Sequence, residues 1–366
     1  MLIDFVGIRR RLPLLAVLVA VGLAAAACGD SSSDDDAAST SSGATEGPGA
    51  SESGALRLGY FANVTHAPAV IGEEEGMFAA SLGEGVQVEY VYFNSGTEAI
   101  EALFSGAIDA SFIGPNPAIN GFAQSGGEAL RIVAGTTSGG ASLVVREGID
   151  SPEDLAGTTL ATPSLGNTQD VALRAWLTEH GYAADVTGGG DVSIRPQANA
   201  DTLTTFREGA IDGAWVPEPW ATRLELEGGG KVLVDERDVW PDGQFVTTHL
   251  IVDTDYLGAN PQVVRALITG LLEAIDVANE DPARARAATN AGIERITTKA
   301  LPESTIAGAW ERLTFTADPI ASSLAKSKDD AVAAGLLDEV DLADIYDLTI
   351  LNELLAERGN TGVGGL

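Results

Sequence analysis

The pattern of apolar and polar residues after position 54 predicts strands and helices in alternation. The predicted strands are residues 56–61, 86–93, 110–113, 158–162 and 192–195. The predicted helices between them are residues 67–78, 97–105, 169–180 and 201–208. From Asn260 onward the pattern predicts helices almost alone, at residues 261–279, 281–298, 303–310, 322–334 and 342–357. Alternation of this kind indicates an α/β fold with mostly parallel sheets and helices on both faces.

A long internal repeat divides this region into two similar halves. Gly106-Ala-Ile-Asp109 returns 103 positions later as Gly209-Ala-Ile-Asp212. At the same offset, residues 56–61 line up with residues 159–164, and residues 88–93 with the segment that includes residues 192–196. A repeat of this length is a repeat of domains, because solenoid units are roughly 20–50 residues long. Two similar lobes leave a cleft between them, and such interfaces are where small ligands bind.

The start of the chain predicts export and a lipid anchor. Three arginines at 9–11 precede an apolar run, Leu12 to Ala27, whose length is typical of a secretory signal. Ala25, Ala26 and Ala27 then directly precede Cys28, which resembles the lipobox of bacterial lipoproteins, although Ala25 stands where that pattern usually has Leu. We expect residues 1–27 to be a signal peptide, Cys28 to be lipidated and residues 28–54 to form a disordered tether. The alternative is an ordinary signal peptide with an incidental cysteine.

Charge and composition exclude several classes of partner. The chain has 21 Lys and Arg against 53 Asp and Glu, a net charge of −32. Nucleic acid is not expected as a partner, because phosphate contacts need clustered basic residues, and adsorption to anionic lipid is disfavoured for the same reason. Three histidines and one cysteine are too few for a His/Cys metal site, so neither a metal nor another cofactor is expected.

An enzyme is the first alternative class, since a two-lobed α/β body could carry chemistry. The sequence shows no Ser-His-Asp arrangement, no phosphate-binding glycine loop and no metal-ligand spacing. The glycine triplets at 188–190 and 228–230 are not followed by Lys and Ser or Thr. We therefore expect a binding protein and not an enzyme.

Five motifs stand near the predicted strand ends: Gly59-Tyr-Phe-Ala-Asn-Val-Thr-His-Ala-Pro68, Phe93-Asn-Ser-Gly-Thr-Glu98, Ile113-Gly-Pro-Asn-Pro-Ala118, Leu165-Gly-Asn-Thr-Gln-Asp170 and Pro217-Glu-Pro-Trp220. Over residues 55–360 the chain resembles the substrate-binding lipoproteins of ABC importers, in the branch that handles nitrate, taurine and aliphatic sulfonates. The resemblance implies the two-lobed periplasmic-binding-protein type II fold. Lobe 1 would span residues 55–142 and lobe 2 residues 143–244, and residues 245–366 would return to lobe 1 and add C-terminal helices.

The same resemblance implies partners and a location. A transmembrane permease and its ATPase would receive the ligand, and the protein would be a monomer anchored through Cys28 at the outer face of the bacterial cell membrane. Closure of the lobes would involve hinges near Gly139-Gly140 and near residues 245–249.

The strand-to-helix junctions supply the candidate ligand-binding residues. They are rich in Ser, Thr, Asn and Gly, which offer hydroxyl, amide and backbone N–H donors. Ligands of open α/β sheets bind beyond the carboxyl ends of the strands, where helix N-termini add partial positive charge. The candidates are Asn63, Thr65, His66, Ser95, Gly96, Thr97, Asn116 and Ser138 in lobe 1, and Ser164, Gly166, Asn167, Thr168, Gln169, Glu218 and Trp220 in lobe 2.

Some of these residues have a competing interpretation. Ser95 and Thr97 could serve only as helix caps, His66 as a structural hydrogen-bonding group, and Trp220 as a packing residue. Glu218 bears most on the ligand. If it faces the cleft, it would pair with the ammonium group of a zwitterion such as taurine, and if it points away, it says nothing about the ligand.

The donor set suits a sulfonate (taurine or an aliphatic sulfonate), whose three oxygens accept hydrogen bonds from several directions. Nitrate or bicarbonate is one alternative ligand. A thiamine-precursor pyrimidine is another, and it would require aromatic rings on both sides, for which Tyr60, Phe61, Trp220 and Phe245 are available.

Overall fold

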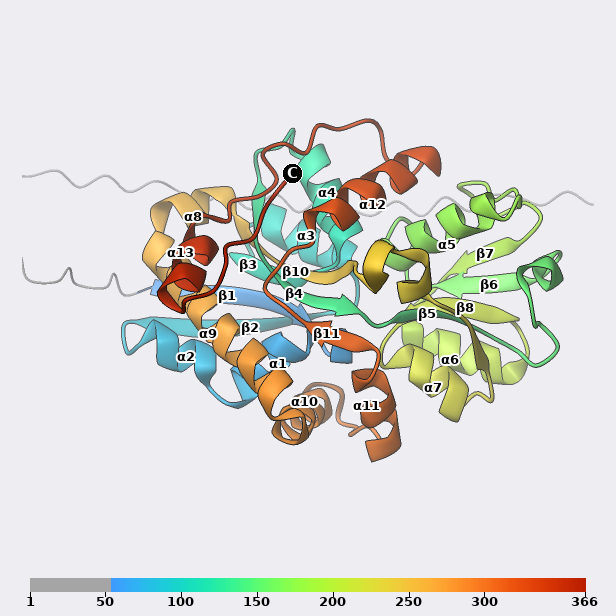
Figure 1. Cartoon of the computed structure of the whole chain (residues 1–366), viewed down its shortest axis with the longest axis horizontal. Helices are drawn as coiled ribbons and strands as arrows, with labels where there is room; N and C mark the ends of the chain where they lie inside the picture. The colour runs from blue at the N-terminus through green and yellow to red at the C-terminus, as the bar shows by residue number, and fades with distance from the viewer. Residues whose placement is uncertain (1–53) are drawn as a thin grey trace, which may run out of the picture. The chain divides into compact units, whose positions relative to one another are not determined.

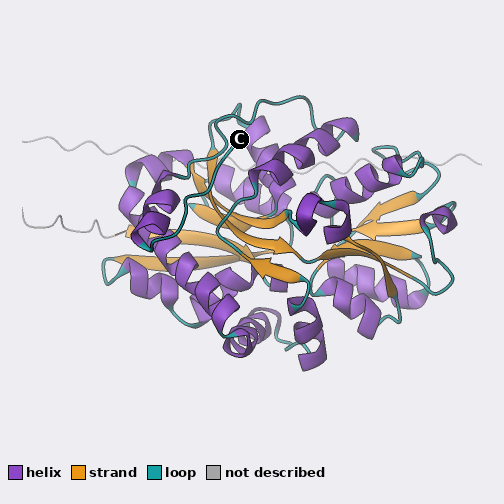
Figure 2. Ribbon diagram, viewed as in Figure 1, coloured by secondary structure: helices purple, strands orange, loops and turns teal. Residues whose placement is uncertain are grey.

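The computed structural model describes residues 54–366. The predicted signal peptide (1–27), the lipidation of Cys28 and all but the last residue of the predicted tether (28–54) lie outside the described residues. The described chain contains two β-sheets, each with helices packed on both faces (Figures 1 and 2).

The first sheet forms the core of lobe 1. It contains β1 (Gly54–Phe61), β2 (Val86–Phe93), β3 (Ala110–Ile113), β4 (Leu130–Gly139), β10 (Val246–Asp253) and β11 (Leu313–Phe315), in the order β11-β4-β10-β3-β1-β2. Strand β1 is parallel to β2 and β3, whereas β10 runs antiparallel between β3 and β4.

The second sheet forms the core of lobe 2 and repeats this arrangement. It contains β5 (Ala141–Val145), β6 (Thr159–Thr162), β7 (Ser193–Pro196), β8 (Gly213–Pro217) and β9 (Lys231–Asp235), in the order β7-β6-β8-β5-β9. Strand β6 is parallel to β7 and β8, and β5 is antiparallel to β8 and β9. Both sheets are therefore mixed. The expected parallel pairing holds for β2-β1-β3 and β7-β6-β8, and each antiparallel partner, β10 or β5, follows a crossing from the other sheet.

The repeated Gly-Ala-Ile-Asp motif has a structural role in both lobes. Asp109 accepts a hydrogen bond from the backbone N–H of Arg57 at 2.8 Å, and Asp212 accepts one from the N–H of Thr159 at 2.8 Å. Asp109, just before β3, is thus tied to β1, and Asp212, just before β8, is tied to the start of β6. Gly106 and Gly209 adopt left-handed φ values of 66° and 81°, which glycine reaches without strain.

Helices cover both faces of each sheet and bury the apolar side chains there. In lobe 1, α1 (Ala67–Glu74), α2 (Met77–Leu82), α9 (Pro261–Glu280), α10 (Pro282–Thr297) and α13 (Thr349–Glu357) lie on one side, and α3 (Gly96–Phe104), α4 (Pro115–Gln124) and α12 (Ala321–Ala333) on the other (Figure 1). In lobe 2, α5 (Thr168–Glu179) covers one face, and α6 (Asn199–Glu208) and α7 (Trp220–Leu226) cover the other. Two more α-helices are α8 (Thr254–Ala259) and α11 (Glu303–Trp310), and the short 3₁₀ helices are η1 (Val64–His66), η2 (Pro152–Leu155), η3 (Glu236–Val239) and η4 (Pro241–Gly243).

Two predicted helices differ from the structure, and several elements were not predicted. The helix predicted at 67–78 is broken at Gly76, whose φ of 70° separates α1 from α2. The helix predicted at 342–357 begins only at Thr349, because residues 345–347 run along β4 and exchange backbone hydrogen bonds with Ile132. The elements that were not predicted include β4, β5, β8, β9, β11, α4, α7 and α8. For β11, three residues are too few to show a period.

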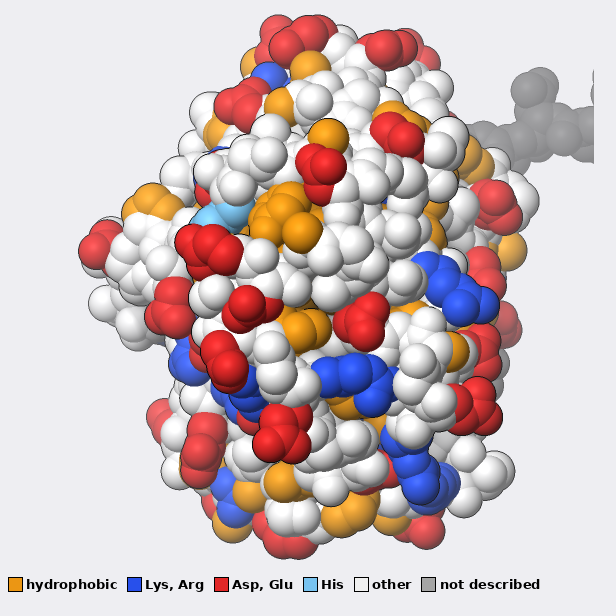
Figure 3. Space-filling model, turned by 90° about the vertical axis from the view of Figure 1, so that its right-hand side faces the viewer, with side chains coloured by type: hydrophobic (Ala, Val, Ile, Leu, Met, Phe, Trp, Pro, Cys, Tyr) orange, Lys and Arg blue, Asp and Glu red, His pale blue; other side chains and the backbone are white. Residues whose placement is uncertain are grey.

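The chain crosses between the sheets after β4, at Gly139-Gly140, and again between β9 and β10. Both glycines have left-handed φ values, 78° and 75°. C-terminal helices also join the lobes, because α11 contacts α7 and α12 contacts α5. The end of lobe 2 nearest the viewer in Figure 3 carries acidic side chains spread over its surface with basic ones between them. Among residues 54–366, none of the helices has the length and apolar character needed to cross a membrane.

Candidate ligand-binding site

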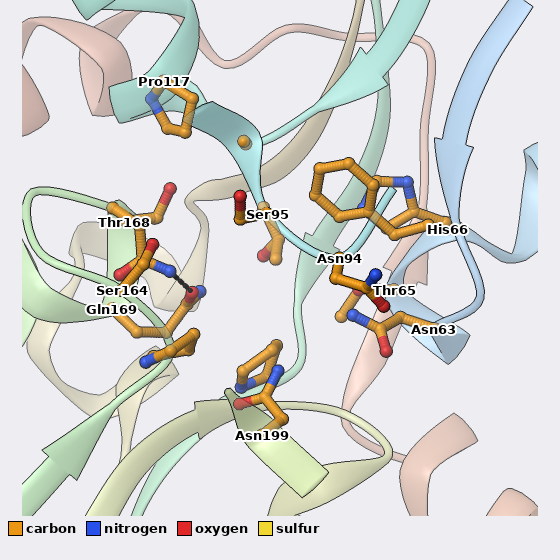
Figure 4. Close-up of a pocket in the computed structure, with 17 residues that line it drawn as sticks. Asn63, Thr65, His66, Asn94, Ser95, Pro117, Ser164, Thr168, Gln169 and Asn199 are labelled. Atoms are coloured by element: carbon orange, nitrogen blue, oxygen red, sulfur yellow. Dashed lines mark hydrogen bonds between the residues drawn. The ribbon is translucent and has the colours of Figure 1, made fainter. Parts of the chain in front are cut away.

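A pocket lies between the two sheets, at the carboxyl ends of their parallel strands (Figure 4). Asn63, Thr65 and His66 follow β1 and lie on one side of it, and Ser164, Thr168 and Gln169 follow β6 and lie on the opposite side. The complete lining is Phe61, Asn63, Thr65, His66, Asn94, Ser95, Gly96, Gly114, Pro117, Pro163, Ser164, Asn167, Thr168, Gln169, Asn199, Pro217 and Thr247. The cavity volume is about 50 Å³. Since one water needs roughly 10–15 Å³ of such volume, the cavity has room for a small ion or a small polar molecule.

Helix N-termini surround this pocket. Ser95 caps α3 by accepting a hydrogen bond from the N–H of Glu98 at 3.3 Å, and Asn167 caps α5 by accepting one from the N–H of Asp170 at 3.0 Å. Asn199 is the first residue of α6. The first N–H groups of a helix have no partner within it and carry partial positive charge. The pocket therefore has a favourable potential for an anion.

The side chains of the pocket supply hydrogen bonds but no fixed charge. Among the described residues that line it there is no Lys, Arg, Asp or Glu. His66 is the one titratable side chain of the lining, and its burial lowers its pKa to about 3, so it is neutral at pH 7. Its ring packs against Phe61, with 4.5 Å between ring centroids and 31° between planes.

Two polar atoms of the pocket have no partner within the described part of the chain. They are Nδ1 of His66 and Oδ1 of Asn199, both buried from solvent. Buried polar atoms are nearly always hydrogen-bonded, and an exception calls for a water or a ligand. These two atoms therefore mark lining residues whose hydrogen bonding is left incomplete by the described part of the chain.

The lobes touch around this pocket. Nε1 of Trp220 in lobe 2 donates to Oδ1 of Asn63 in lobe 1 at 3.2 Å, and Nδ2 of Asn120 in lobe 1 donates to the carbonyl oxygen of Gly166 in lobe 2 at 3.4 Å. Gly114 approaches Thr168 closely, since a Cβ at Gly114 would lie 2.7 Å from Oγ1 of Thr168. The described conformation is therefore one in which the lobes are closed around the pocket.

Most of the sequence-derived candidates are brought together here. Those in the lining are Asn63, Thr65, His66, Ser95, Gly96, Ser164, Asn167, Thr168 and Gln169. Thr97 and Gly166 lie just outside, in a neighbouring groove. Ser138 lines a separate hollow with Arg237, and the amide of Asn116 is buried and donates to the carbonyl oxygen of Ser327 at 3.1 Å. Trp220 contacts Asn63 and is not in the lining.

Of the two orientations that the sequence left open for Glu218, the structure shows the one that points away from the pocket. Its side chain is fully buried, and its two oxygens accept hydrogen bonds from Arg312 Nη1 at 2.8 Å and from the N–H of Thr222 at 3.1 Å. Burial raises the pKa of Glu218, and Arg312 opposes that shift. Sequence reasoning could not find Arg312, because it lies 94 positions away beyond α11.

Comparison with known proteins assigns the chain to a family. The model of the NMT1-like family matches residues 49–292, more than half of the chain. The chain belongs to the NMT1-like family. A taurine-binding periplasmic protein of Escherichia coli K12 is 28% identical to this NMT1-like protein over 219 residues, 58% of this chain and 64% of that protein. The bicarbonate-binding protein CmpA of Synechococcus is 24% identical over 245 residues, 60% of this chain and 52% of CmpA. The matches thus span less than two thirds of these relatives.

Solved structures show the fold of this NMT1-like protein. The alkanesulfonate-binding protein SsuA from Xanthomonas axonopodis pv. citri, bound to MOPS, has a TM-score of 0.66 at 19% identity, covering 79% of this chain and 96% of SsuA. The predicted two-lobed α/β fold of periplasmic binding proteins is confirmed.

Some lining residues of this NMT1-like protein were missed. Asn94 directly precedes Ser95, and Asn199 lies in the repeat segment that matches residues 94–97, so both carried a signal in the sequence. Gly114 lies in the motif at 113–118 and so carried a signal too, whereas Thr247 carried none, because its place depends on how the returning β10 meets the other lobe.

Proposed function

We propose that this protein is the extracytoplasmic binding component of an ABC importer and captures a small sulfonate-type ligand, taurine or an aliphatic sulfonate, between its lobes. The observation that carries the proposal is a pocket of uncharged donors at helix N-termini that draws residues from both lobes. An anion with several acceptor oxygens suits this arrangement without any basic side chain. The taurine-binding and sulfonate-binding names of relatives support the same ligand class.

Nitrate or bicarbonate is the second candidate. The small cavity volume favours a compact oxyanion, and a bicarbonate-binding protein is among the relatives. With Glu218 bound to Arg312, no described carboxylate is available in the lining to pair with an ammonium group. An unsubstituted alkanesulfonate therefore fits the described pocket better than the zwitterion taurine does.

The pyrimidine alternative has less support. Phe61 is the one Phe, Tyr or Trp among the described lining residues. The rings of Tyr60 and Phe245 are both buried. The hydroxyl of Tyr60 donates to Glu73, and Phe245 stacks on Trp240. A planar heteroaromatic ligand would lack a second facing ring.

The partners and location follow as part of this proposal. A permease and its ATPase would receive the ligand, and a lipid on Cys28 would hold the protein outside the cytoplasmic membrane as a monomer. The protein itself would carry out no catalysis.

Thermal unfolding of the protein with taurine, ethanesulfonate, nitrate, bicarbonate and a thiamine-precursor pyrimidine tests this function. A ligand at a hundred times its Kd adds about 2.7 kcal/mol to the free energy of unfolding. We expect stabilisation by sulfonates that weakens in Thr168→Ala. The matched control is Thr204→Ala, which removes an exposed hydroxyl from α6. Stabilisation by the pyrimidine alone, or equal loss in both variants, would contradict the proposal.

A further inference from the structure

His66 has a fixed position in the pocket and an unused hydrogen-bonding atom. Its side chain is only 4% exposed, and the Phe61 ring holds the imidazole in place. Its Nδ1 is buried and has no partner in residues 54–366. His249 also has a buried Nδ1 without a partner, but its Nε2 is bonded to the carbonyl oxygen of Pro319 at 3.1 Å and its ring lies away from the pocket.

No other side chain of the described pocket lining can gain or lose a charge. The described lining has hydroxyls, amides and backbone but no basic or acidic side chain. An anion that enters brings a full negative charge into a closed space, where helix N-termini offset only part of it. The imidazole of His66 is the group that can supply a compensating positive charge there.

The elements packed against His66 do not already control its protonation. The turn η1 contacts α1, α11, β4 and β10, and the Phe61 ring belongs to β1. Titratable side chains on these elements have other partners: Arg57 with Asp109, Tyr60 with Glu73, Glu73 and Glu74 with Arg295, Arg131 with backbone oxygens, His249 with Pro319, Asp253 with the N–H of Tyr256, and Glu303 with Arg286. The low pKa of His66 is accordingly caused by burial and by no nearby charge.

We propose that His66 takes up one proton from solvent when an anion enters the pocket, so that the complex pairs an imidazolium with the negative charge of the ligand. This inference rests on the proposed function, because it requires an anionic ligand in this pocket. An opposite charge within about 4–6 Å favours the charged form of a titratable group and raises the pKa of a histidine.

The linkage has a definite sign. The pKa of His66 is about 3 in the free protein and is higher in the complex, so the complex binds more protons than the free protein between these values. Affinity therefore rises as pH falls, by up to about tenfold for each pH unit in that window. A ligand ammonium beside His66 would have the opposite effect, since it would favour the neutral ring as an acceptor.

Calorimetric titration with ethanesulfonate, or with nitrate if the thermal panel selects nitrate, tests the proposal. Both anions stay fully ionised between about pH 5 and pH 8, so any pH dependence comes from the protein. We expect a Kd at least about threefold lower at pH 5 than at pH 7. Titrations at pH 5 in two buffers with different ionisation enthalpies should show net proton uptake.

Variants assign the proton to His66. His66→Gln keeps a polar side chain and should remove both the pH dependence and the proton uptake, whereas His180→Gln, at an exposed histidine at the end of α5, should remove neither. The protein has only three histidines, so NMR titration of their imidazoles should show one pKa that rises on ligand binding. Binding with a flat or inverted pH dependence would overturn this inference and leave the proposed function intact. Failure of every anion in the panel to bind would overturn both.

Discussion

Gly114→Ala is a sharp test of the closed arrangement of the lobes. Gly114 follows β3 in lobe 1 and has φ of −71° and ψ of 160°, which alanine adopts without strain. The added Cβ would lie 2.7 Å from Oγ1 of Thr168 in lobe 2, and its next neighbours are 3.6 Å and 3.8 Å away. The methyl group therefore meets one obstacle, and that obstacle belongs to the opposite lobe.

Overpacking of this kind costs roughly 1–3 kcal/mol. Because separation of the lobes relieves the contact, the cost should fall on the closed, liganded form. We expect Kd to rise by about 5- to 150-fold, since 1.4 kcal/mol corresponds to a tenfold change. The free energy of unfolding without ligand should change by less than about 0.5 kcal/mol.

Calorimetry with the ligand selected by the thermal panel, together with urea unfolding of the free protein, measures both quantities. Gly258→Ala is the matched control, because a Cβ there would meet nothing within 4 Å. In a Thr168→Ala background, Gly114→Ala should have little further effect on Kd. An unchanged Kd in the single variant would show that the added methyl group does not meet Thr168 in the liganded form. A loss of unfolding free energy without ligand as large as the loss of binding free energy would show that the cost does not fall on the closed form.

Three further predictions concern the interlobe contacts and buried charges. Arg312→Ala leaves the fully buried carboxylate of Glu218 without its cation, so urea unfolding should show that the free energy of unfolding falls by about 3–5 kcal/mol; a fall of less than about 1 kcal/mol would contradict this. The fall should grow as pH rises, because burial keeps the pKa of Glu218 above its value in the unfolded chain. Trp220→Phe removes the hydrogen bond to Asn63 and should weaken ligand binding by about 1 kcal/mol in calorimetry while leaving stability unchanged; an unaltered Kd would contradict it. Burial lowers the pKa of His249 to about 4, below its value in the unfolded chain, so the free energy of unfolding should decrease as pH is lowered from about 6.5 toward 4. His249→Gln should reduce the slope of this pH dependence by about 1.4 kcal/mol per pH unit, and an unchanged slope would contradict the prediction.

Much of the fold was predictable because local sequence patterns define many of its strands and helices, and because the first lobe's pattern is repeated in the second. Strands β2 and β3 and helix α11 have the predicted bounds, since apolar runs and turn signals define each of them within a few residues. The mixed character of the sheets was not predictable in this way. It depends on where β5 and β10 insert after the chain crosses between lobes, and no local pattern records that choice.

The site was predictable where it is built from strand ends. Asn63, Ser95 and Thr168 lie in the pocket because each directly follows a strand or begins the next helix. Glu218 has the same kind of position in the sequence, yet it points to Arg312, which arrives from the C-terminal part of the chain. A partner that is distant in the sequence determines the direction of the Glu218 side chain, and the residues next to Glu218 contain no signal for that partner.

A small anion should bind between the lobes at uncharged helix N-termini, and a crystal structure of the protein with ethanesulfonate would show whether it does. In that structure we expect the sulfonate oxygens to lie within hydrogen-bonding distance of the first turns of α3 and α5, with His66 beside them. A sulfonate bound outside this pocket, or held mainly by Lys or Arg, would contradict this mode of binding.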